Sequence, residues 1–207
     1  MRGIPTDLIE GTAWVIGGGP SLDGFDPTVL SGRTVVVTNE AFLESPDAVA
    51  LVFADLGWWE TRREVVLKSF NGIIITRGPH ETVYRRDGIH WMQFHGRLDW
   101  SRDPTMMGAH NAGLIALNSA WLMGASAAVL LGFDMHTEAG RNNYHDRHPD
   151  KKGAEMDERY RQVFMPEFER AARRIEEDGF AVVNATPGSA LRCFPKRSLE
   201  WCLDHMG

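Results

Sequence analysis

The sequence predicts an α/β protein built around a mostly parallel sheet. Seven short apolar runs have the length and composition of buried strands, and two of them end at a glycine. Segments of helical character, two of them followed by a glycine that would end a helix, lie between some of these runs. Strands that alternate with helices in this way are typical of a parallel sheet covered by helices on both faces.

The expected elements follow the chain from end to end. Helices are expected over 58–70, 111–123, 155–178 and 198–205, where apolar residues recur at helical spacing or alanine and leucine are abundant. No repeat, linker or low-complexity segment divides the chain, so we expect one Rossmann-like three-layer domain over 1–207. The expected strands are 12–16, 34–38, 48–53, 73–76, 90–94, 127–131 and 180–183.

Composition limits the classes of partner. The formal net charge of −6 argues against a surface that neutralises many nucleic-acid phosphates. No apolar run approaches the ~20 residues that a membrane-spanning helix needs, and residues 1–10 lack the apolar core of a signal peptide. Cys193 and Cys202 form no CxxC motif and fit a reducing compartment. We therefore expect a cytoplasmic protein without a membrane partner, and a homo-oligomer is compatible with the sequence.

A glycine loop follows the first expected strand. Ligands of open parallel sheets bind beyond the carboxyl ends of the strands, where Gly17, Gly18 and Gly19 lie. Glycines allow backbone to approach a phosphate, successive N–H groups can form an anion-binding nest, and Ser21 adds a hydroxyl donor. The loop is neither a GxGxxG fingerprint nor a Walker A motif. It predicts a site for a phosphorylated nucleotide, the alternative being a tight turn from strand to helix.

A long polar segment, 133–153, is the second unusual feature. Loops of this length in a compact domain are usually functional or disordered. This one contains His136, Tyr144, His145 and His148, and histidine suits proton transfer because its ordinary pKa lies near neutrality. We expect a functional loop, the alternative being that these are solvated surface residues.

Several longer segments resemble two protein families. "VIGGGPSLDGFD" with the later Thr38-Asn39-Glu40, "GAHNAGLIALNSAWLMGASAAVLLGFDM", "YHDRHP" and "VVNATPGSALRCF" occur in the order in which similar segments occur in those families. One family is the archaeal-type 6-hydroxymethylpterin diphosphokinases (MptE-like). The other is the bacterial sialyltransferases of glycosyltransferase family 42, which carry a GxGPSL loop and a later Cys-Asn-Gln segment.

The resemblance to the sialyltransferases implies a cytidine nucleotide on the glycine loop. Gly18 stands where that family has an asparagine, and His136 stands where it has a tyrosine near the leaving phosphate, so the resemblance supports a nucleotide site more firmly than CMP-sialic acid specificity. The positions that match or replace the family's motifs are Gly17, Gly19, Ser21, Asn39, Asn111, Gly132, Asp134 and, in the Pro-x-Ser-x-Leu turn, Ser189.

The resemblance also implies a general base in the polar loop. The family's base is a histidine shortly after a tyrosine, and Tyr144 is followed by both His145 and His148, between which the spacing does not decide. The chosen histidine would take a proton from an acceptor hydroxyl. Tyr144 and His136 would stabilise charge on the leaving phosphate.

The acidic positions allow a rival chemistry. Asp55 ends the third expected strand and Asp134 follows the sixth, so both could hold Mg²⁺ that bridges the phosphates of ATP, as a diphosphokinase would need. The alternative is that both aspartates cap turns. Arg77, at the end of the fourth strand, is a candidate contact for phosphate or carboxylate. His110 and Asn111 begin a helix, where free N–H groups attract anions.

Together these patterns predict a nucleotide-dependent transferase. The favoured reaction is glycosyl transfer from a CMP-sugar-like donor to an acceptor hydroxyl, with a loop histidine as base. The alternatives are an ATP- and Mg²⁺-dependent diphosphokinase of the MptE-like type and a non-catalytic nucleotide-binding protein. The expected partners are a small-molecule nucleotide and a hydroxyl acceptor.

Overall fold

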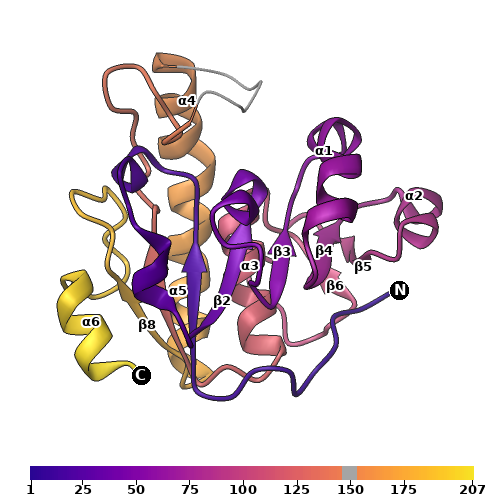
Figure 1. The fold of residues 1–207 in the computed structure, drawn as a ribbon, viewed down its shortest axis with the longest axis horizontal. Helices are drawn as coiled ribbons and strands as arrows, with labels where there is room; N and C mark the ends of the chain where they lie inside the picture. Colours follow the sequence, from indigo (N-terminus) through magenta and orange to yellow (C-terminus); the bar gives the residue numbers. More distant parts are fainter. Residues whose placement is uncertain (146–152) are drawn as a thin grey trace.

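A computed structural model of the protein describes residues 1–145 and 153–207 and contains one eight-stranded sheet (Figure 1). Every strand pairing is parallel. The strands are β1 (Thr12–Ile16), β2 (Thr34–Thr38), β3 (Ala50–Val52), β4 (Ile73–Arg77), β5 (His90–Phe94), β6 (Met106–Met107), β7 (Ala127–Leu131) and β8 (Ala181–Asn184). The Rossmann-like α/β prediction is confirmed.

The order of the strands creates a single switch point. Across the sheet they run β6-β5-β4-β3-β2-β1-β7-β8. The chain moves outward from β1 to β6 on one side, returns, and adds β7 and β8 on the other side of β1. The crossovers that follow β1 and β7 therefore run over opposite faces of the sheet. The carboxyl edge beside these two strands is the place where ligands of this fold class bind.

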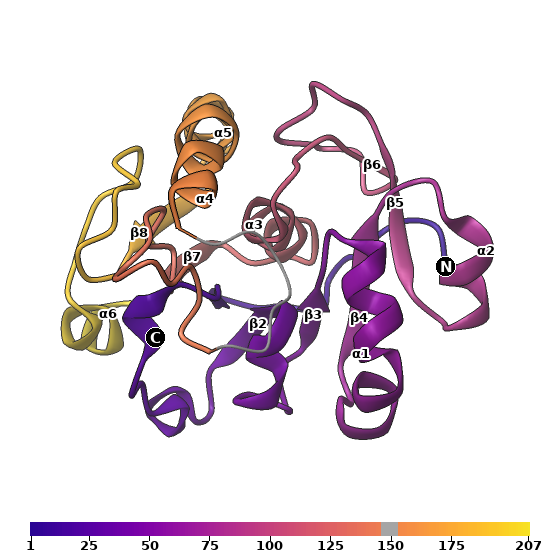
Figure 2. The ribbon, with the colours of Figure 1, turned by 90° about the horizontal axis from the view of Figure 1, so that it is seen from above.

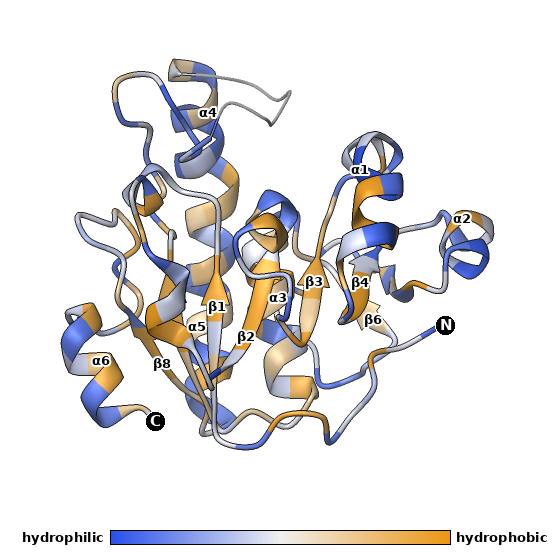
Figure 3. Cartoon of the chain, in the orientation of Figure 1, coloured by the Kyte–Doolittle hydropathy of each residue, from blue (hydrophilic) through white to orange (hydrophobic). Residues whose placement is uncertain are grey.

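Helices cover both faces of the sheet (Figure 2). One face carries α3 (Ala112–Leu122) and α5 (Met165–Glu177), and the other carries α1 (Leu56–Ser69) and α6 (Leu199–His205). The alternating side chains of each strand divide between the two layers: Val15 packs under α3, whereas Trp14 packs on the opposite face. Figure 3 shows the resulting pattern, with apolar strands inside and polar helix faces outside.

Local sequence explains the ends of the main helices. Asp55 begins α1 by accepting hydrogen bonds from the N–H groups of Gly57, at 2.7 Å, and Trp58. Asn111 begins α3 in the same way, with its side-chain oxygen 2.8 Å from the Leu114 nitrogen. Gly124 follows α3 at φ +108°, a conformation in which only glycine is unstrained.

The connections differ from expectation in several places. The crossovers after β1 and β2 contain only 3₁₀ turns, η1 (Pro20–Leu22), η2 (Pro27–Leu30) and η3 (Asn39–Leu43). The helix predicted over 155–178 is divided into α4 (Ala154–Arg159), a π-helical segment η4 (Tyr160–Phe164) and α5. The short elements β6 and α2 (Glu81–Arg86) were not predicted because neither has a clear apolar period. None of the helices in the described ranges combines the length and apolarity needed to cross a membrane.

Candidate functional site

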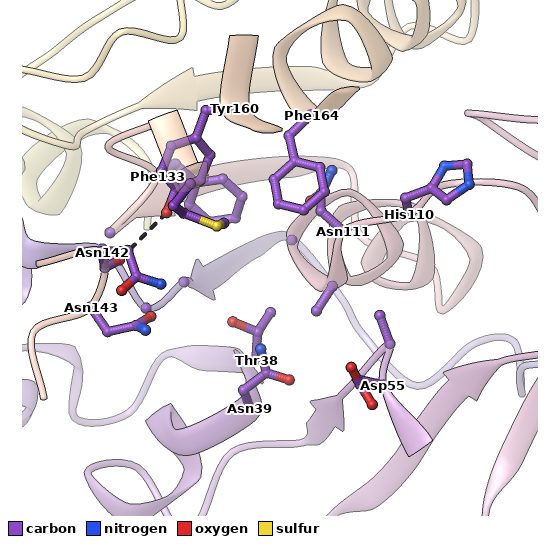
Figure 4. A pocket seen from close by; sticks show the side chains of 18 of the residues that line it. Thr38, Asn39, Asp55, His110, Asn111, Phe133, Asn142, Asn143, Tyr160 and Phe164 are labelled. Atoms are coloured by element: carbon purple, nitrogen blue, oxygen red, sulfur yellow. Dashed lines mark hydrogen bonds between the residues drawn. The ribbon is translucent and has the colours of Figure 1, made fainter. Parts of the chain in front are cut away.

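A cavity of about 630 Å³ lies along the carboxyl edge of the sheet. Its floor comes from the loops after β1, β2, β3 and β7 and from the end of β4. The start of α3, the described part of the polar loop and the segment η4 form its walls (Figure 4). Asn142 and Asn143 stand at one side of it and His110 at the other, with Asn39 and Asp55 between them in the view.

The glycine loop is packed tightly against the loop that follows β7. The N–H of Gly17 donates to the Leu131 carbonyl at 2.7 Å, and that of Gly19 donates to the Gly132 carbonyl at 2.9 Å. A β-carbon on Gly19 would lie 1.8 Å from the Asp134 Oδ2 atom, so only glycine fits. Two of the three N–H groups expected to form an anion nest are therefore used within the protein, and this part of the prediction is wrong.

All three glycines line the cavity, and Gly18 is the one without backbone crowding. The nearest atom to a β-carbon at Gly18 would be the Asn143 side-chain oxygen, at 3.0 Å, and nothing in the backbone crowds it. The Gly18 carbonyl accepts a hydrogen bond from the Tyr144 N–H at 3.1 Å. The polar loop thus meets the glycine loop at Gly18, and the two together form one end of the cavity.

Asp134 joins the two loops. Its carboxylate accepts hydrogen bonds from the Ser21 N–H, at 2.9 Å, and from the Ser21 hydroxyl, at 2.8 Å. Asp134 is 3% exposed, and burial, which outweighs these two bonds, raises the pKa of its carboxyl group. Asp134 borders the cavity, but Ser21 does not line it, so the predicted ligand contact of Ser21 is replaced by a structural one.

Ser189 is also structural. Its hydroxyl donates to the Phe133 carbonyl at 2.5 Å and accepts from the Asn184 side chain at 3.0 Å. It is 3% exposed and does not line the cavity. The turn that contains it supports the loop after β7 from behind, where the Ala190 N–H donates to the Asp134 carbonyl at 2.7 Å.

The two aspartates predicted to share Mg²⁺ are held apart. Strands β3 and β7, which precede Asp55 and Asp134, have β2 and β1 between them, and neighbouring strands lie about 4.8 Å apart, so their axes are about 14 Å apart. A single Mg²⁺ binds oxygens at ~2.1 Å. Asp55 caps α1 and Asp134 binds Ser21, which are the structural alternatives, and the pair does not fit one shared ion. No group of three or more metal-ligating side chains occurs among the described residues.

The residues predicted in the polar loop separate into different environments. His145 lines the cavity. Tyr144 instead packs with the apolar cluster behind the glycine loop and lines a smaller cavity beside Leu22. His136 lies outside both cavities and contacts the Thr137 carbonyl at 3.2 Å through Nδ1. His148 lies outside the described residues.

Asn39 and Arg77 line the cavity as the sequence predicts. Asn39 has a left-handed backbone, with φ +46°, which asparagine tolerates better than most residues. Arg77 donates from Nε to the Ala109 carbonyl at 3.0 Å, and its guanidinium lies 4.8 Å above the Phe94 ring. Burial lowers the pKa of Arg77, opposed by the charges of Tyr84, Glu167 and Asp55.

A second wall of the cavity was not predicted from the sequence. The π-helical segment brings Tyr160 and Phe164 to the cavity, and Tyr160 donates its hydroxyl to the Asn142 carbonyl at 3.4 Å. Burial raises the pKa of Tyr160. Such segments often occur at functional sites because the wider turn redirects side chains. Asn142, Asn143 and Arg159 complete this wall and were also not singled out.

At the opposite end, the start of α3 is bonded to α5. Asn111 donates from Nδ2 to Glu167 at 3.2 Å, and the N–H of His110 lies 3.1 and 3.0 Å from the two Glu167 carboxylate oxygens. The His110 ring contacts the same carboxylate through Nδ1. Asn111 therefore has its oxygen on Leu114 and its amide on Glu167, which makes it a structural residue that borders the cavity.

These features define a Rossmann-like α/β protein with a polar cavity at its topological switch point. No protein-family model and no curated protein matches the chain. Among solved structures, the chain is similar to the sialyltransferase CST-II in complex with a trisaccharide acceptor and CMP, with a TM-score of 0.54 and 13% identity over 90% of this chain and 86% of that one. This likeness shows a shared fold. A dehydrogenase/reductase from Sinorhizobium meliloti matches 94% of this chain and 78% of its own, with a TM-score of 0.33 and 15% identity.

The packing of Gly19 leads to a first prediction. In Gly19→Ala the new methyl group would overlap the Asp134 carboxylate and lie 2.7 Å from the Gly132 carbonyl, so we expect the free energy of unfolding to fall by about 3 kcal/mol. Gly18→Ala is the matched control, because only a movable side-chain atom is nearby. Urea unfolding measures both. Equal losses in the two variants would show that the contact with Asp134 is not what requires glycine.

The burial of Asp134 leads to a second prediction. A carboxyl group whose pKa is raised in the folded protein favours folding fully below its ordinary pKa of 3.8, and this contribution is lost as the pH rises through the raised value. The free energy of unfolding of the wild type, minus that of Asp134→Asn, should therefore decrease from below pH 3.8 to neutrality. Urea unfolding over this range tests the sign. A difference that increases with pH would mean that the bonds from Ser21 outweigh burial.

Proposed function

We propose that the protein is a glycosyltransferase that moves a sugar from a nucleotide-sugar donor to an acceptor hydroxyl. The observation that carries the proposal is the polar cavity at the switch point of a fold shared with an enzyme solved with CMP and a trisaccharide acceptor. A volume of about 630 Å³ lies within the range of about 300–1,000 Å³ that small-molecule sites occupy. The transfer chemistry and its residues are our inference from this site.

The end of the cavity at the glycine loop suits the nucleotide. Gly18 leaves space there, and Asn39, Asn142 and Asn143 offer amide donors and acceptors that fit a base or a ribose. The backbone nest expected from the sequence is not available, so the phosphate needs other partners. Arg159, which lines the same cavity, supplies a positive charge.

The reaction also needs a group that accepts the proton of the incoming hydroxyl. Histidine is suited to this role at neutral pH. The sequence assigns it to the polar loop, where His145 is the described histidine that lines the cavity. His80 and His110 are the other described histidines that line it.

The two alternatives have different support. A diphosphokinase that holds Mg²⁺ between Asp55 and Asp134 conflicts with the two strands that separate them. A non-catalytic nucleotide-binding protein would use the same glycine loop, and nucleotide release from a sugar donor distinguishes it from an enzyme. We therefore favour glycosyl transfer, with a cytidine or uridine nucleotide as the leaving group.

A third prediction concerns nucleotide binding. We expect CMP, CDP or UDP to raise the melting temperature without added metal, because a ligand at ~100 times its Kd stabilises the folded state by about 2.7 kcal/mol. A thermal-shift series with CMP, CDP, UDP, ATP and GTP, each with and without Mg²⁺, measures this. Stabilisation by ATP only with Mg²⁺ would favour the diphosphokinase, and no response to any nucleotide would refute the proposal.

The Gly18→Ala variant is the control for the location of the nucleotide. Its methyl group enters the cavity without touching backbone, so its melting temperature without ligand should remain close to that of the wild type. The shift caused by the nucleotide should become smaller. An unchanged shift would place the nucleotide away from the glycine loop.

A further inference from the structure

His110 is a histidine of the cavity whose ring is fixed by a buried acid. It immediately precedes Asn111, which begins α3, and its Nδ1 contacts the Glu167 carboxylate. Glu167 lies on α5 and is 2% exposed. The same carboxylate accepts the backbone N–H of His110 and the side-chain amide of Asn111. Three donors from two adjacent residues thus meet one buried acceptor.

This arrangement determines which ring nitrogen is left to react. A carboxylate accepts hydrogen bonds, so Nδ1 carries the hydrogen, and in the neutral ring Nε2 then keeps its lone pair. The His110 side chain is 45% exposed and borders the cavity, and no hydrogen bond to Nε2 occurs within the described residues. The edge contact with Phe94, with ring centres 5.3 Å apart, further restricts the ring. The contacts with Glu167 and Phe94 therefore hold the His110 ring in an orientation in which Nε2 can accept a proton from the cavity.

The position of His110 relative to the glycine loop also fits this role. The glycine loop follows β1, whereas Phe94 ends β5, and β2, β3 and β4 lie between those two strands. Figure 4 shows His110 across the cavity from Asn142 and Asn143. His145 follows the segment that contacts Gly18 and so belongs to the nucleotide end. An acceptor that enters a cavity occupied by the nucleotide at that end would meet His110.

We propose that His110 is the general base of the transfer reaction and that Glu167 is its positioning residue. This inference rests on the proposed function. The acceptor O–H bond breaks and its proton moves to Nε2 of His110, while the oxygen forms a bond to the anomeric carbon of the sugar. The bond from that carbon to the phosphate oxygen breaks, and its electron pair leaves with the nucleotide. The imidazolium then releases its proton to water.

The charges around the pair come from three elements. Arg77, at the end of β4, interacts electrostatically with Glu167 and with Asp55 at the start of α1. Arg170, on α5, interacts with Glu167 and is bound to Asp99. Two cations therefore interact electrostatically with the carboxylate that holds His110. A pH profile of the reaction has to be compared with the profile of a variant that lacks the imidazole, because these groups also affect charge in the cavity.

The experiment measures nucleotide release from CMP-, UDP- and GDP-linked sugars with a trisaccharide acceptor, using the donor that the wild type consumes. We expect His110→Ala to lower kcat by about 10²- to 10⁴-fold with a nearly unchanged KM for the donor. Added imidazole should restore part of the rate, and the acid limb of the kcat/KM profile should disappear. Glu167→Gln should lower kcat by about 10- to 100-fold. His205→Ala, an exposed histidine on α6, is the matched control and should behave as the wild type.

Several outcomes would overturn the proposal. If His110→Ala retains the wild-type kcat while His145→Ala or His148→Ala loses it, the base lies in the polar loop. If imidazole restores nothing and the melting temperature of His110→Ala falls, the pair only holds α3 to α5. If the wild type releases no nucleotide from any donor and no nucleotide shifts its melting temperature, the proposed function fails, and the role of His110 fails with it.

Discussion

The contact between the loops after β1 and β7 is the constraint on which the site depends. These strands are neighbours at the switch point, and their loops are joined by the carboxylate of Asp134, which accepts two bonds from Ser21. Gly19 is required because the same carboxylate occupies the space of a side chain. These bonds hold the two loops together at one end of the cavity. This contact requires the Asp134 carboxylate to be buried, and burial raises its pKa.

This constraint changes how a glycine loop contributes to binding. Glycines after a first strand commonly leave N–H groups free for a phosphate, but here Gly17 and Gly19 donate to the β7 segment. Gly17 and Gly19 serve the close approach of two backbones, whereas a β-carbon at Gly18 would meet no backbone atom of another segment within 4 Å. Most polar groups that line the cavity are therefore side chains of other elements. Asn39 lines the cavity from a left-handed backbone conformation. The Arg77 guanidinium is held by a hydrogen bond to the Ala109 carbonyl and by its contact with the Phe94 ring.

The sequence predicts the strands well because a buried parallel strand is apolar along its whole length and needs no partner to be recognised. Asn39, Asp55 and Arg77 could be placed at the site because the carboxyl ends of parallel strands share one edge. The same rule does not tell a ligand contact from a structural bond, so Ser21 and Ser189 were predicted as ligand contacts, whereas in the structure both bond within the protein and neither lines the cavity. The pair of His110 and Glu167 could not be found, since the two residues are 57 positions apart and nothing local links them.

The helical segment after the polar loop connects the two ends of the cavity. Its π-helical turn places Tyr160 and Phe164 in the wall beside Asn142, and its continuation, α5, carries Glu167 to His110. A regular helix would not give both sets of side chains the same directions, because the π-turn inserts an extra residue into the helical repeat. One continuous helical segment therefore lines the cavity at the glycine-loop end through Tyr160 and, through Glu167, holds the imidazole of His110 at the opposite end.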